Sequence, residues 1–431
     1  MIPLPITDRW QRGQIKNVAE VTLGKMLQSS DTGEDVQASY MRAANVQPDG
    51  VLRLEPKQMW FKPGELEGLS LRRGDVVVVE GGVGGFGRAA YLSEDLSGWG
   101  FQNSINRLRP TAATDGRFLA YYLIALRAAG FIERYCNVVS MPHLTAEKLA
   151  ALPVPIPDKV EQSAIGDFLD RETARIDTLI EEQKRLVELL QERRQALLEH
   201  CVTRGLNKQT LLKPSTLTWT ESVPDHWTVA NIRRFATMKT GHTPSRSVPE
   251  YWDDCDIPWF TLADVWQLRD ATQTYLGSTS NLISQMGLEN SAAELLPAGT
   301  VVLSRTASVG FTGIMPTAMA TSQDYWNWVC GPNLLPEYLV YVFRAMRSEF
   351  QALMIGSTHQ TIYQPIAAAI RIPVPPIDEQ RSIAAYLDEQ TSKIDMLIAE
   401  TKVFIELSRE RRTELITAAV TGQIDVRNEV G

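Results

Sequence analysis

The 431-residue chain is too long for one hydrophobic core, and its net charge of -8 argues against a DNA-binding protein that acts through its own basic surface. No segment carries a basic excess: residues 1–150 hold 17 Lys and Arg against 16 Asp and Glu, and acidic residues outnumber basic ones in every later segment. No apolar run approaches the roughly 20 residues of a membrane helix, and residues 1–10 lack the regions of a signal peptide. We therefore expect a cytoplasmic protein of several domains that does not contact a membrane.

The first globular part is predicted to span residues 1–152. Residues 40–46 indicate a strand that leads into a polar loop, and the β-branched run of residues 76–79 after Gly74 indicates a buried strand. A short helix is expected around residues 118–121. The apolar residues Trp10, Ile15 and Val18 precede Gly24 and belong to the predicted core.

Residues 82–87 fit the G-x-G-x-x-G pattern of a dinucleotide-binding loop. No clear amphipathic helix follows, and the pattern lies in the middle of the domain rather than at its first strand. At its counterpart in the second half of the chain only Gly310 is kept, opposite Gly85. A tight turn is the better interpretation, although a nucleotide-binding enzyme stays open as an alternative.

A long helix is predicted in the region 153–206, after the proline-rich residues 153–157. Asp158 is the expected N-cap, with Glu161 at capping-box spacing. Alternate steps of four and three residues trace a coiled-coil seam. Its positions are Leu169, Thr173, Ile176, Ile180, Gln183, Val187, Leu190, Arg194, Leu197 and Cys201.

The whole arrangement occurs twice. After a linker at 207–220, a second globular part is expected at 221–372 and a second helical region at 373–431, with Asp378 as its N-cap. An offset of 218 superimposes Asp177 on Asp395. It also superimposes the polar seam residues Gln183 and Arg194 on Thr401 and Arg412, and we expect these four seam residues to specify how the two helices pair. The second seam is Leu387, Thr391, Ile394, Ile398, Thr401, Ile405, Ser408, Arg412, Leu415 and Ala419.

The globular parts repeat in outline only. Tyr40 matches Trp259 at an offset of 219, and Glu80 falls opposite Arg305. The pair Gln102 and Asn103 is matched to Gln323 and Asp324. The helices are therefore expected to share one task, whereas the two domains share a scaffold and display different surfaces.

No catalytic constellation is found. The five histidines lie in unrelated contexts, and the four cysteines show no paired spacing, so neither a zinc site nor a disulfide framework is indicated. The carboxylates of the helices alternate with Lys and Arg, as on a solvated coiled-coil face. We expect a non-enzymatic binding protein without a cofactor or metal.

The residues 373–380, followed by Ile383, Leu387 and the pair Ile394 and Asp395, resemble the specificity subunit of type I restriction-modification systems. The resemblance covers essentially the whole chain. It implies an α+β fold of two mixed α/β target-recognition domains, each followed by a long helix, with the helices paired as an antiparallel coiled coil. It also implies that each domain reads one half of a split site in double-stranded DNA, and that the helices set the spacing and dock DNA adenine methyltransferase subunits. A restriction subunit (nuclease and translocase) can join such an assembly.

The residues expected to contact DNA are polar or aromatic residues at matching loops. Tyr40 and Trp259 can equally be core aromatics, and Arg88 and Arg305 are expected to contact phosphate rather than bases. The candidates are Lys25, Gln28, Tyr40, Arg42, Asn45, Gln47, Arg88, Gln102 and Asn103 in the first domain, and Lys239, Thr243, Ser245, Arg246, Trp259, Asp264, Arg305, Ser308, Gln323 and Tyr325 in the second. A coiled-coil assembly scaffold that never contacts DNA is the alternative suggested by the acidic charge.

Overall fold

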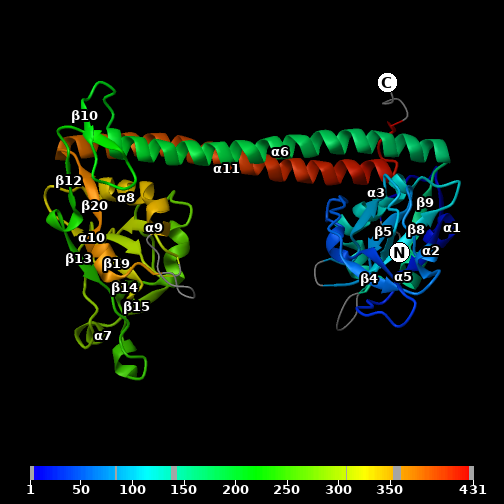
Figure 1. Cartoon of the computed structure of the whole chain (residues 1–431), viewed down its shortest axis with the longest axis horizontal. Coiled ribbons are helices and arrows are strands. Elements are labelled where there is room, and N and C mark those ends of the chain that lie inside the picture. Colours follow the sequence, from blue (N-terminus) through cyan, green and yellow to red (C-terminus); the bar gives the residue numbers. More distant parts are fainter. Residues whose placement is uncertain (1–3, 83–84, 137–142, 307, 353–360, 427–431) are drawn as a thin grey trace. The chain divides into compact units, whose positions relative to one another are not determined.

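The computed structural model describes residues 4–82, 85–136, 143–306, 308–352 and 361–426. It divides into two compact units, one of Met1–Gln183 with Val403–Gly431 and the other of Lys184–Lys402. Each unit holds one globular domain together with part of both long helices, α6 (Lys159–Arg204) and α11 (Ile377–Val420) (Figure 1). We call the two globular parts domain 1 and domain 2.

Domain 1 is built from short strands and short helices that precede α6. Its strands are β1 (Gln11–Gln14), β2 (Ala19–Leu23), β3 (Val36–Met41), β4 (Gln58–Phe61), β5 (Val76–Val79), β6 (Ala89–Tyr91), β7 (Trp99–Phe101), β8 (Ile105–Pro110) and β9 (Pro153–Ile156). Its helices are α1 (Ile15–Val18), η1 (Ala43–Asn45), α2 (Glu65–Gly68), α3 (Gly116–Ala128), α4 (Phe131–Tyr135) and α5 (Ala146–Ala151).

Domain 2 repeats this pattern between the two long helices. Its strands are β10 (Leu212–Pro214), β11 (Ser222–Pro224), β12 (Thr228–Asn231), β13 (Ala236–Thr240), β14 (Ile257–Phe260), β15 (Asn281–Ile283), β16 (Val301–Ser304), β17 (Thr312–Ile314), β18 (Ala320–Thr321), β19 (Tyr325–Cys330) and β20 (Arg371–Val374). Its helices are η2 (Ile232–Arg234), η3 (Pro249–Trp252), η4 (Leu262–Leu268), α7 (Gln285–Glu289), α8 (Pro336–Ala345), α9 (Arg347–Ala352) and α10 (Gln364–Ala369).

The two domains have the same sheets in the same order. An antiparallel sheet runs β2-β8-β5-β6 in domain 1 and β13-β19-β16-β17 in domain 2. A second sheet of mixed direction runs β4-β3-β7 and β15-β14-β18, with the pairs β3–β7 and β14–β18 parallel. The strand predicted at residues 76–79 and its counterpart at 301–304 are buried along their full length, because both faces of the sheet are covered.

Each domain encloses its own core, with the amphipathic helix α3 or α8 packed on the main sheet. Both cores extend into the long helices. Ile165 and Leu169 of α6, together with Ile416 and Val420 of α11, join the core of domain 1. The core of domain 2 includes Leu198, Cys201 and Val202 of α6 and Ile383 and Leu387 of α11.

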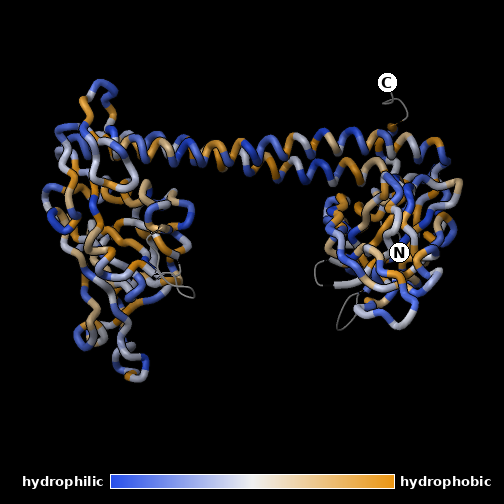
Figure 2. Tube along the Cα trace, in the orientation of Figure 1, coloured by the Kyte–Doolittle hydropathy of each residue, from blue (hydrophilic) through white to orange (hydrophobic). Residues whose placement is uncertain are grey.

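The helices α6 and α11 pair antiparallel, as the family resemblance implied. In each unit the start of one helix packs beside the end of the other. The predicted seam positions are buried or half-buried in both helices, whereas most of the charged positions between them are exposed. In unit 2, Leu190 packs with Ile394 and Ile398. Figure 2 shows hydrophobic and hydrophilic residues alternating along both helices.

The starts of the two helices differ. Asp158 caps α6 as predicted: its Oδ1 accepts the backbone N–H of Glu161 at 2.9 Å. The prediction for Asp378 was wrong, because this residue lies inside the first turn of α11 and pairs with Arg381 at 2.6 Å. Pro376 occupies the place of Asp158, and its carbonyl accepts the N–H groups of Glu379 and Gln380, both at 3.0 Å.

The segment predicted as a linker at 207–220 contains β10, which forms an antiparallel pair with β11. No helix within the described ranges is both long and apolar enough to span a membrane.

Candidate nucleic-acid interface

Three loops meet at one side of each domain, and we call this surface the three-loop edge. In domain 1 it comprises residues 24–28 after β2, residues 42–47 after β3 and residues 102–104 between β7 and β8. Backbone hydrogen bonds hold the loops together: the N–H of Lys25 donates to Phe101 at 3.0 Å, and that of Gln102 donates to Met41 at 2.9 Å.

Domain 2 builds the same three-loop edge from residues 241–246, 261–266 and 322–324. The N–H of His242 donates to Thr321 at 3.0 Å, and the N–H of Ser322 donates to Phe260 at 3.0 Å. Two predicted residues meet across this edge, since the hydroxyl of Thr243 donates to Oε1 of Gln323 at 2.6 Å. The sequence thus identified loops that do lie together.

A glycine allows the loops to approach so closely. A Cβ atom at Gly24 would lie 2.2 Å from the carbonyl oxygen of Gln102, and one at Gly241 would lie 2.1 Å from that of Thr321. Real Cβ atoms do not come so near a backbone oxygen, so both positions require glycine.

The three-loop edge of domain 2 encloses a polar hollow of about 380 Å³. Among its walls are four of the predicted residues, Thr243, Arg246, Trp259 and Gln323, although only the edge of Trp259 is reached because its side chain is 2% exposed. Arg246 is exposed, and its guanidinium lies 5.4 Å from the centre of the Trp252 ring. The remaining lining residues are Thr261, Leu262, Ala263, Asn281, Ser322 and Asp324.

Two predicted residues serve as helix caps. Asn45 and Asp264 are buried, and each accepts the backbone N–H three residues earlier, of Arg42 at 2.9 Å and of Thr261 at 3.0 Å. Each is the third residue of the short helix that follows β3 or β14 and caps its start by bonding back to the N-cap residue, Arg42 or Thr261. This role accounts for an Asn or Asp at these positions without any contact to a base.

Three predicted aromatic residues are buried. Tyr40 and Trp259 lie on equivalent central strands, 6% and 2% exposed, and pack in the small cores behind the three-loop edges. Tyr325 is fully buried, and its hydroxyl donates to the carbonyl of Thr261 at 2.9 Å. Tyr325 thus supports the loop that follows β14 from beneath.

Several predicted cations are held in ion pairs. Lys25 pairs with Glu65, and Arg42 lies 3.1 Å from Glu55. Lys239 lies on β13, outside the three-loop edge, and pairs with Glu294 at 2.7 Å. Binding of a phosphate by these side chains would compete with the carboxylates.

The remaining predicted residues of domain 1 are half-buried and line its three-loop edge or its neighbourhood. Gln28 donates to Asp35 at 2.6 Å, and Gln47 donates to the carbonyl of Ala44 at 2.9 Å. Arg88 reaches the carbonyl of Val46 at 3.4 Å. Gln102 and Asn103 form the third loop itself.

Arg305 of domain 2 stands where domain 1 has Glu80. Its backbone N–H donates to Asp324 at 2.9 Å, as that of Glu80 donates to Ser104 at 2.9 Å. The guanidinium of Arg305 lies 4.3 Å from the centre of the Trp326 ring, and burial lowers its pKa. Burial raises the pKa of Glu80.

The two serines predicted in domain 2, Ser308 and Ser245, differ in exposure. Ser308 is half-buried, and its backbone N–H donates to Thr306 at 2.6 Å. Ser245 is exposed and shares a hydrogen bond of 2.8 Å with Ser247.

Two matches between the domains were wrong by one or two residues. The strand pairs Val79–Ile105 and Ser304–Tyr325 are equivalent, so Gln102 and Asn103 correspond to Ser322 and Gln323. The loops differ in length, and the offset changes along the chain.

The second correction concerns the glycine turn. Gly87 and Gly310, with φ of 75° and 87°, both donate their N–H to the last residue of the preceding strand, so Gly310 corresponds to Gly87 and not to Gly85. Of the glycine pattern, Val83 and Gly84 lie outside the described residues. The described part leads into strand β6 rather than a helix, which removes the support for a dinucleotide loop.

Sequence reasoning missed two residues of the domain 2 edge. Asn281 lines the polar hollow from β15, opposite Trp259 in the sheet. Trp266 is 63% exposed on η4. The offset of 219 that relates Tyr40 to Trp259 places Trp266 opposite the predicted residue Gln47, and this signal could have identified it.

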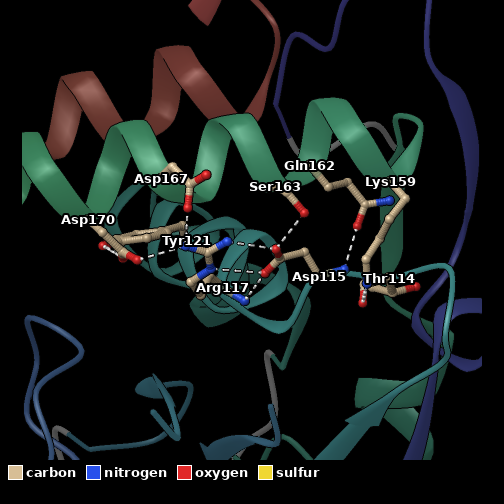
Figure 3. Close-up of polar contacts among 9 residues, drawn as sticks. All are labelled: Thr114, Asp115, Arg117, Tyr121, Lys159, Gln162, Ser163, Asp167 and Asp170. Carbon is tan, nitrogen blue, oxygen red and sulfur yellow. Dashed lines mark hydrogen bonds and ion pairs between the residues drawn. The ribbon is translucent and has the colours of Figure 1, made fainter. Parts of the chain in front are cut away.

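A polar joint fixes domain 1 to the start of α6 (Figure 3). Arg117 of α3 points toward the helix and contacts Asp167 at 2.5 Å and Asp170 at 3.1 Å. The hydroxyl of Tyr121 also donates to Asp170, at 2.8 Å. Asp167 and Asp170 are among the helix carboxylates that were predicted to lie on a solvated face, and here they bind domain 1 instead.

Asp115 is the centre of this joint. Its carboxylate accepts hydrogen bonds from Arg117 at 3.0 Å and from Ser163 of α6 at 2.9 Å. Burial alone would raise the pKa of Asp115, but the hydrogen bonds from Arg117 outweigh it and the pKa is lowered. The joint therefore depends on an ionised Asp115.

Comparisons with known proteins agree with this architecture. A family model described as the type I restriction modification DNA specificity domain matches residues 7–189 and again residues 224–406. The MjaIX specificity subunit of Methanocaldococcus jannaschii is 28% identical over 195 residues, which are 45% of this chain and 43% of that subunit. The MjaVIII specificity subunit of the same organism is 19% identical over 72% of this chain and 70% of its own length.

Two solved structures share the fold over nearly the whole chain. A chain from a study of complex assembly and conformational transition of the type I R-M system has a TM-score of 0.70 at 17% identity, covering 97% of this chain and 99% of its own. The HsdS subunit of Thermoanaerobacter tengcongensis has a TM-score of 0.55 at 16% identity, covering 97% and 98%. None of these comparisons supports a scaffold that never contacts DNA. Because the family model matches both halves of the chain, the protein belongs to the specificity subunits of type I restriction-modification systems.

Proposed function

We propose that each domain reads one half of a split sequence in double-stranded DNA through its three-loop edge. The antiparallel helices would hold the two half-sites at a fixed separation and dock DNA adenine methyltransferase subunits. The observation that carries this proposal is the repetition of one scaffold with unlike edge residues. The same backbone contacts join the loops in both domains, whereas the exposed side chains differ.

The exposed polar residues of the edges are the proposed contacts to DNA. In domain 2 they are Arg246, Gln323 and Asn281 around the polar hollow. Arg can bind guanine with two hydrogen bonds, and Asn or Gln can do the same with adenine. In domain 1 we propose the half-buried Gln47, Gln102 and Asn103. In the two domains together, five buried residues hold the loops in place: Asn45, Tyr40, Trp259, Asp264 and Tyr325.

The acidic charge of the chain is compatible with this function if partners contribute most of the phosphate contacts. Affinity for DNA depends strongly on neutralised phosphates, and the edge cations Lys25 and Arg42 are already paired with carboxylates. We therefore propose tight specific binding only in the assembled complex. In that complex the partner methyltransferase, and where present a restriction subunit, would carry the catalysis, in the cytoplasm where the DNA lies.

Mapping methylated adenines tests the proposal. The chain is co-expressed with the methyltransferase subunit encoded beside it, and host DNA is sequenced for methylated adenine. We expect a split motif with two unlike halves and a fixed spacer. A complex that forms with an active methyltransferase but adds no such motif would contradict the proposal.

A further inference from the structure

Two arginines of the helix seam each contact more than the partner helix. In unit 1, Nε of Arg412 on α11 lies 2.9 Å from Oδ1 of Asp177 on α6, and its Nη2 donates to the carbonyl oxygen of Asp49 at 3.2 Å. Asp49 belongs to domain 1. The arginine therefore joins both helices and the domain.

Unit 2 repeats this arrangement with residues at the same offset of 218. Nε of Arg194 on α6 lies 2.9 Å from Oδ1 of Asp395 on α11, and its Nη2 donates to the carbonyl oxygen of Ala271 in domain 2 at 2.6 Å. Pairing of the helices needs only the carboxylate. The second contact, to a backbone carbonyl, is additional and occurs in both units.

The contacted loops continue directly from the three-loop edges. In domain 1 the loop of residues 46–52 follows η1 and contains Gln47, whose N–H donates to Val51 at 2.9 Å. The cap residue Asn45 also donates to the carbonyl of Arg53 at 2.7 Å, so both ends of the loop are tied together. The hydrogen bond from Arg412 to Asp49 therefore restrains the whole loop that contains Gln47.

In domain 2 the loop of residues 269–275 follows η4, which carries Trp266. Ala271 has φ of 56°, a left-handed conformation that is unfavourable for a residue other than glycine and persists only where surrounding contacts enforce it. Arg194 bonds its carbonyl, and the buried Arg344 donates to the carbonyl of Gln273 at 2.7 Å. Two arginines thus fix this loop.

We infer that Arg412 and Arg194 are positioning residues that lock the loop continuing from the three-loop edge of their own unit to the helix pair. The assignment is crosswise in sequence: Arg412, on the second long helix, positions the loop of domain 1, and Arg194, on the first, positions that of domain 2. The consequence for DNA reading rests on the proposed function. The consequence for the loops does not.

Hydrogen exchange tests the loops without DNA, in the full chain assembled with its methyltransferase. Arg412→Met should speed exchange of residues 46–52 about tenfold, the effect of losing a charged hydrogen bond, and leave residues 269–275 unchanged. Arg194→Met should do the reverse. The matched control is Asp177→Asn, which weakens helix pairing but keeps the arginine and its bond to Asp49, and should leave residues 46–52 protected.

The inference is overturned if Asp177→Asn speeds exchange as much as Arg412→Met, or if either arginine variant affects both loops alike. Should the methionine variants fail to assemble, Arg412→Lys and Arg194→Lys carry the same expectation. A lysine can pair with the carboxylate but lacks the planar fork that also reaches the carbonyl.

Methylation specificity tests the consequence for DNA. Rates are measured on duplexes with single base changes in one half-site or the other. Arg412→Met should lower the ratio of cognate to base-changed methylation rates about tenfold for changes in one half-site only. Arg194→Met should lower that ratio for changes in the opposite half-site only. If a variant lost discrimination equally in both half-sites, or in neither, the consequence for DNA reading would be overturned. A wild-type complex that methylates no split site would refute the proposed function and this consequence, whatever the exchange result.

Discussion

The indole N–H of Trp10 donates to Oε2 of Glu161 at 2.9 Å, which fastens the beginning of the chain to the first turn of α6. Arg9 reaches the other oxygen of the same carboxylate at 2.8 Å. Trp227 and Glu379 repeat the contact at 3.1 Å in unit 2. Both domains are thus attached to a long helix by a buried tryptophan that donates to a glutamate of the first turn.

Trp10→Phe should lower the free energy of unfolding of unit 1 by about 1–3 kcal/mol, because it leaves a buried carboxylate oxygen without its donor. Trp227→Phe should have a smaller effect on unit 2, because the half-buried Glu379 keeps Nε2 of His226 at 2.8 Å from the same oxygen. The control is Trp266→Phe, at an exposed tryptophan. Urea denaturation followed by circular dichroism gives the comparison, and equal stability of Trp10→Phe and the control would contradict the assigned role.

Gly24→Ala should destabilise domain 1 by about 2 kcal/mol, because the added Cβ would overlap the backbone of Gln102 and force the loops apart. The matched control is Gly68→Ala, where a Cβ meets nothing within 4 Å. Thermal unfolding of both variants measures the difference. If Gly24→Ala were as stable as Gly68→Ala, the loops of the edge would not be packed as described.

The parts of the fold that depend on local spacing were predictable. The seam of α6 and α11 follows from steps of four and three residues, and its arginines at matched positions do join the two helices. Their partners, Asp395 for Arg194 and Asp177 for Arg412, were not predicted. Duplication also related Tyr40 to Trp259, which occupy equivalent strand positions.

The errors came from features that depend on the fold. Loop lengths differ between the domains, so the offset of 219 between Tyr40 and Trp259 does not carry over to Asn103 and Gln323, which are 220 residues apart (323 − 103). A sequence also does not tell whether an Asn or Asp after a strand caps a helix or faces a ligand. For Asn45 and Asp264 the three-residue spacing to the helix start was the available signal for a cap.

Asp115→Asn should show how the joint of Figure 3 depends on pH. The pKa of Asp115 lies below the ordinary value of 3.8, so its stabilisation is fully present above about pH 4 and is lost as the pH falls through the folded-state pKa. We expect wild type to exceed the variant in stability by about 1–2 kcal/mol near pH 6, and the gap to narrow as the pH falls below 3.8. Melting temperatures across that range provide the test; a gap independent of pH would show that charge on Asp115 is not involved.

Arg246→Ala should weaken binding of the assembled complex to DNA. Arg246 is exposed beside the polar hollow and stacks near Trp252, so it can reach a phosphate or a base edge. If it contacts phosphate, the slope of log affinity against log salt should fall by about one. Arg381→Ala, at a 62% exposed arginine on α11, is the control. DNA titrations at several salt concentrations measure both quantities. If Arg246→Ala and Arg381→Ala bound DNA with equal affinity, Arg246 would not be part of the interface.

Trp266→Ala should reduce specific DNA binding without reducing stability. The side chain is 63% exposed, so its removal leaves no cavity, and Trp266 lies three residues from Ala263 of the polar hollow, on the same side of a 3₁₀ turn. An exposed aromatic at this place can pack on a thymine methyl group or a sugar. We expect about tenfold weaker binding to the cognate site, an unchanged melting temperature, and little change on unrelated DNA. Met286→Ala, at a 51% exposed residue of α7, is the control. If both substitutions left cognate binding intact, the reading surface of domain 2 would end at the polar hollow and exclude η4.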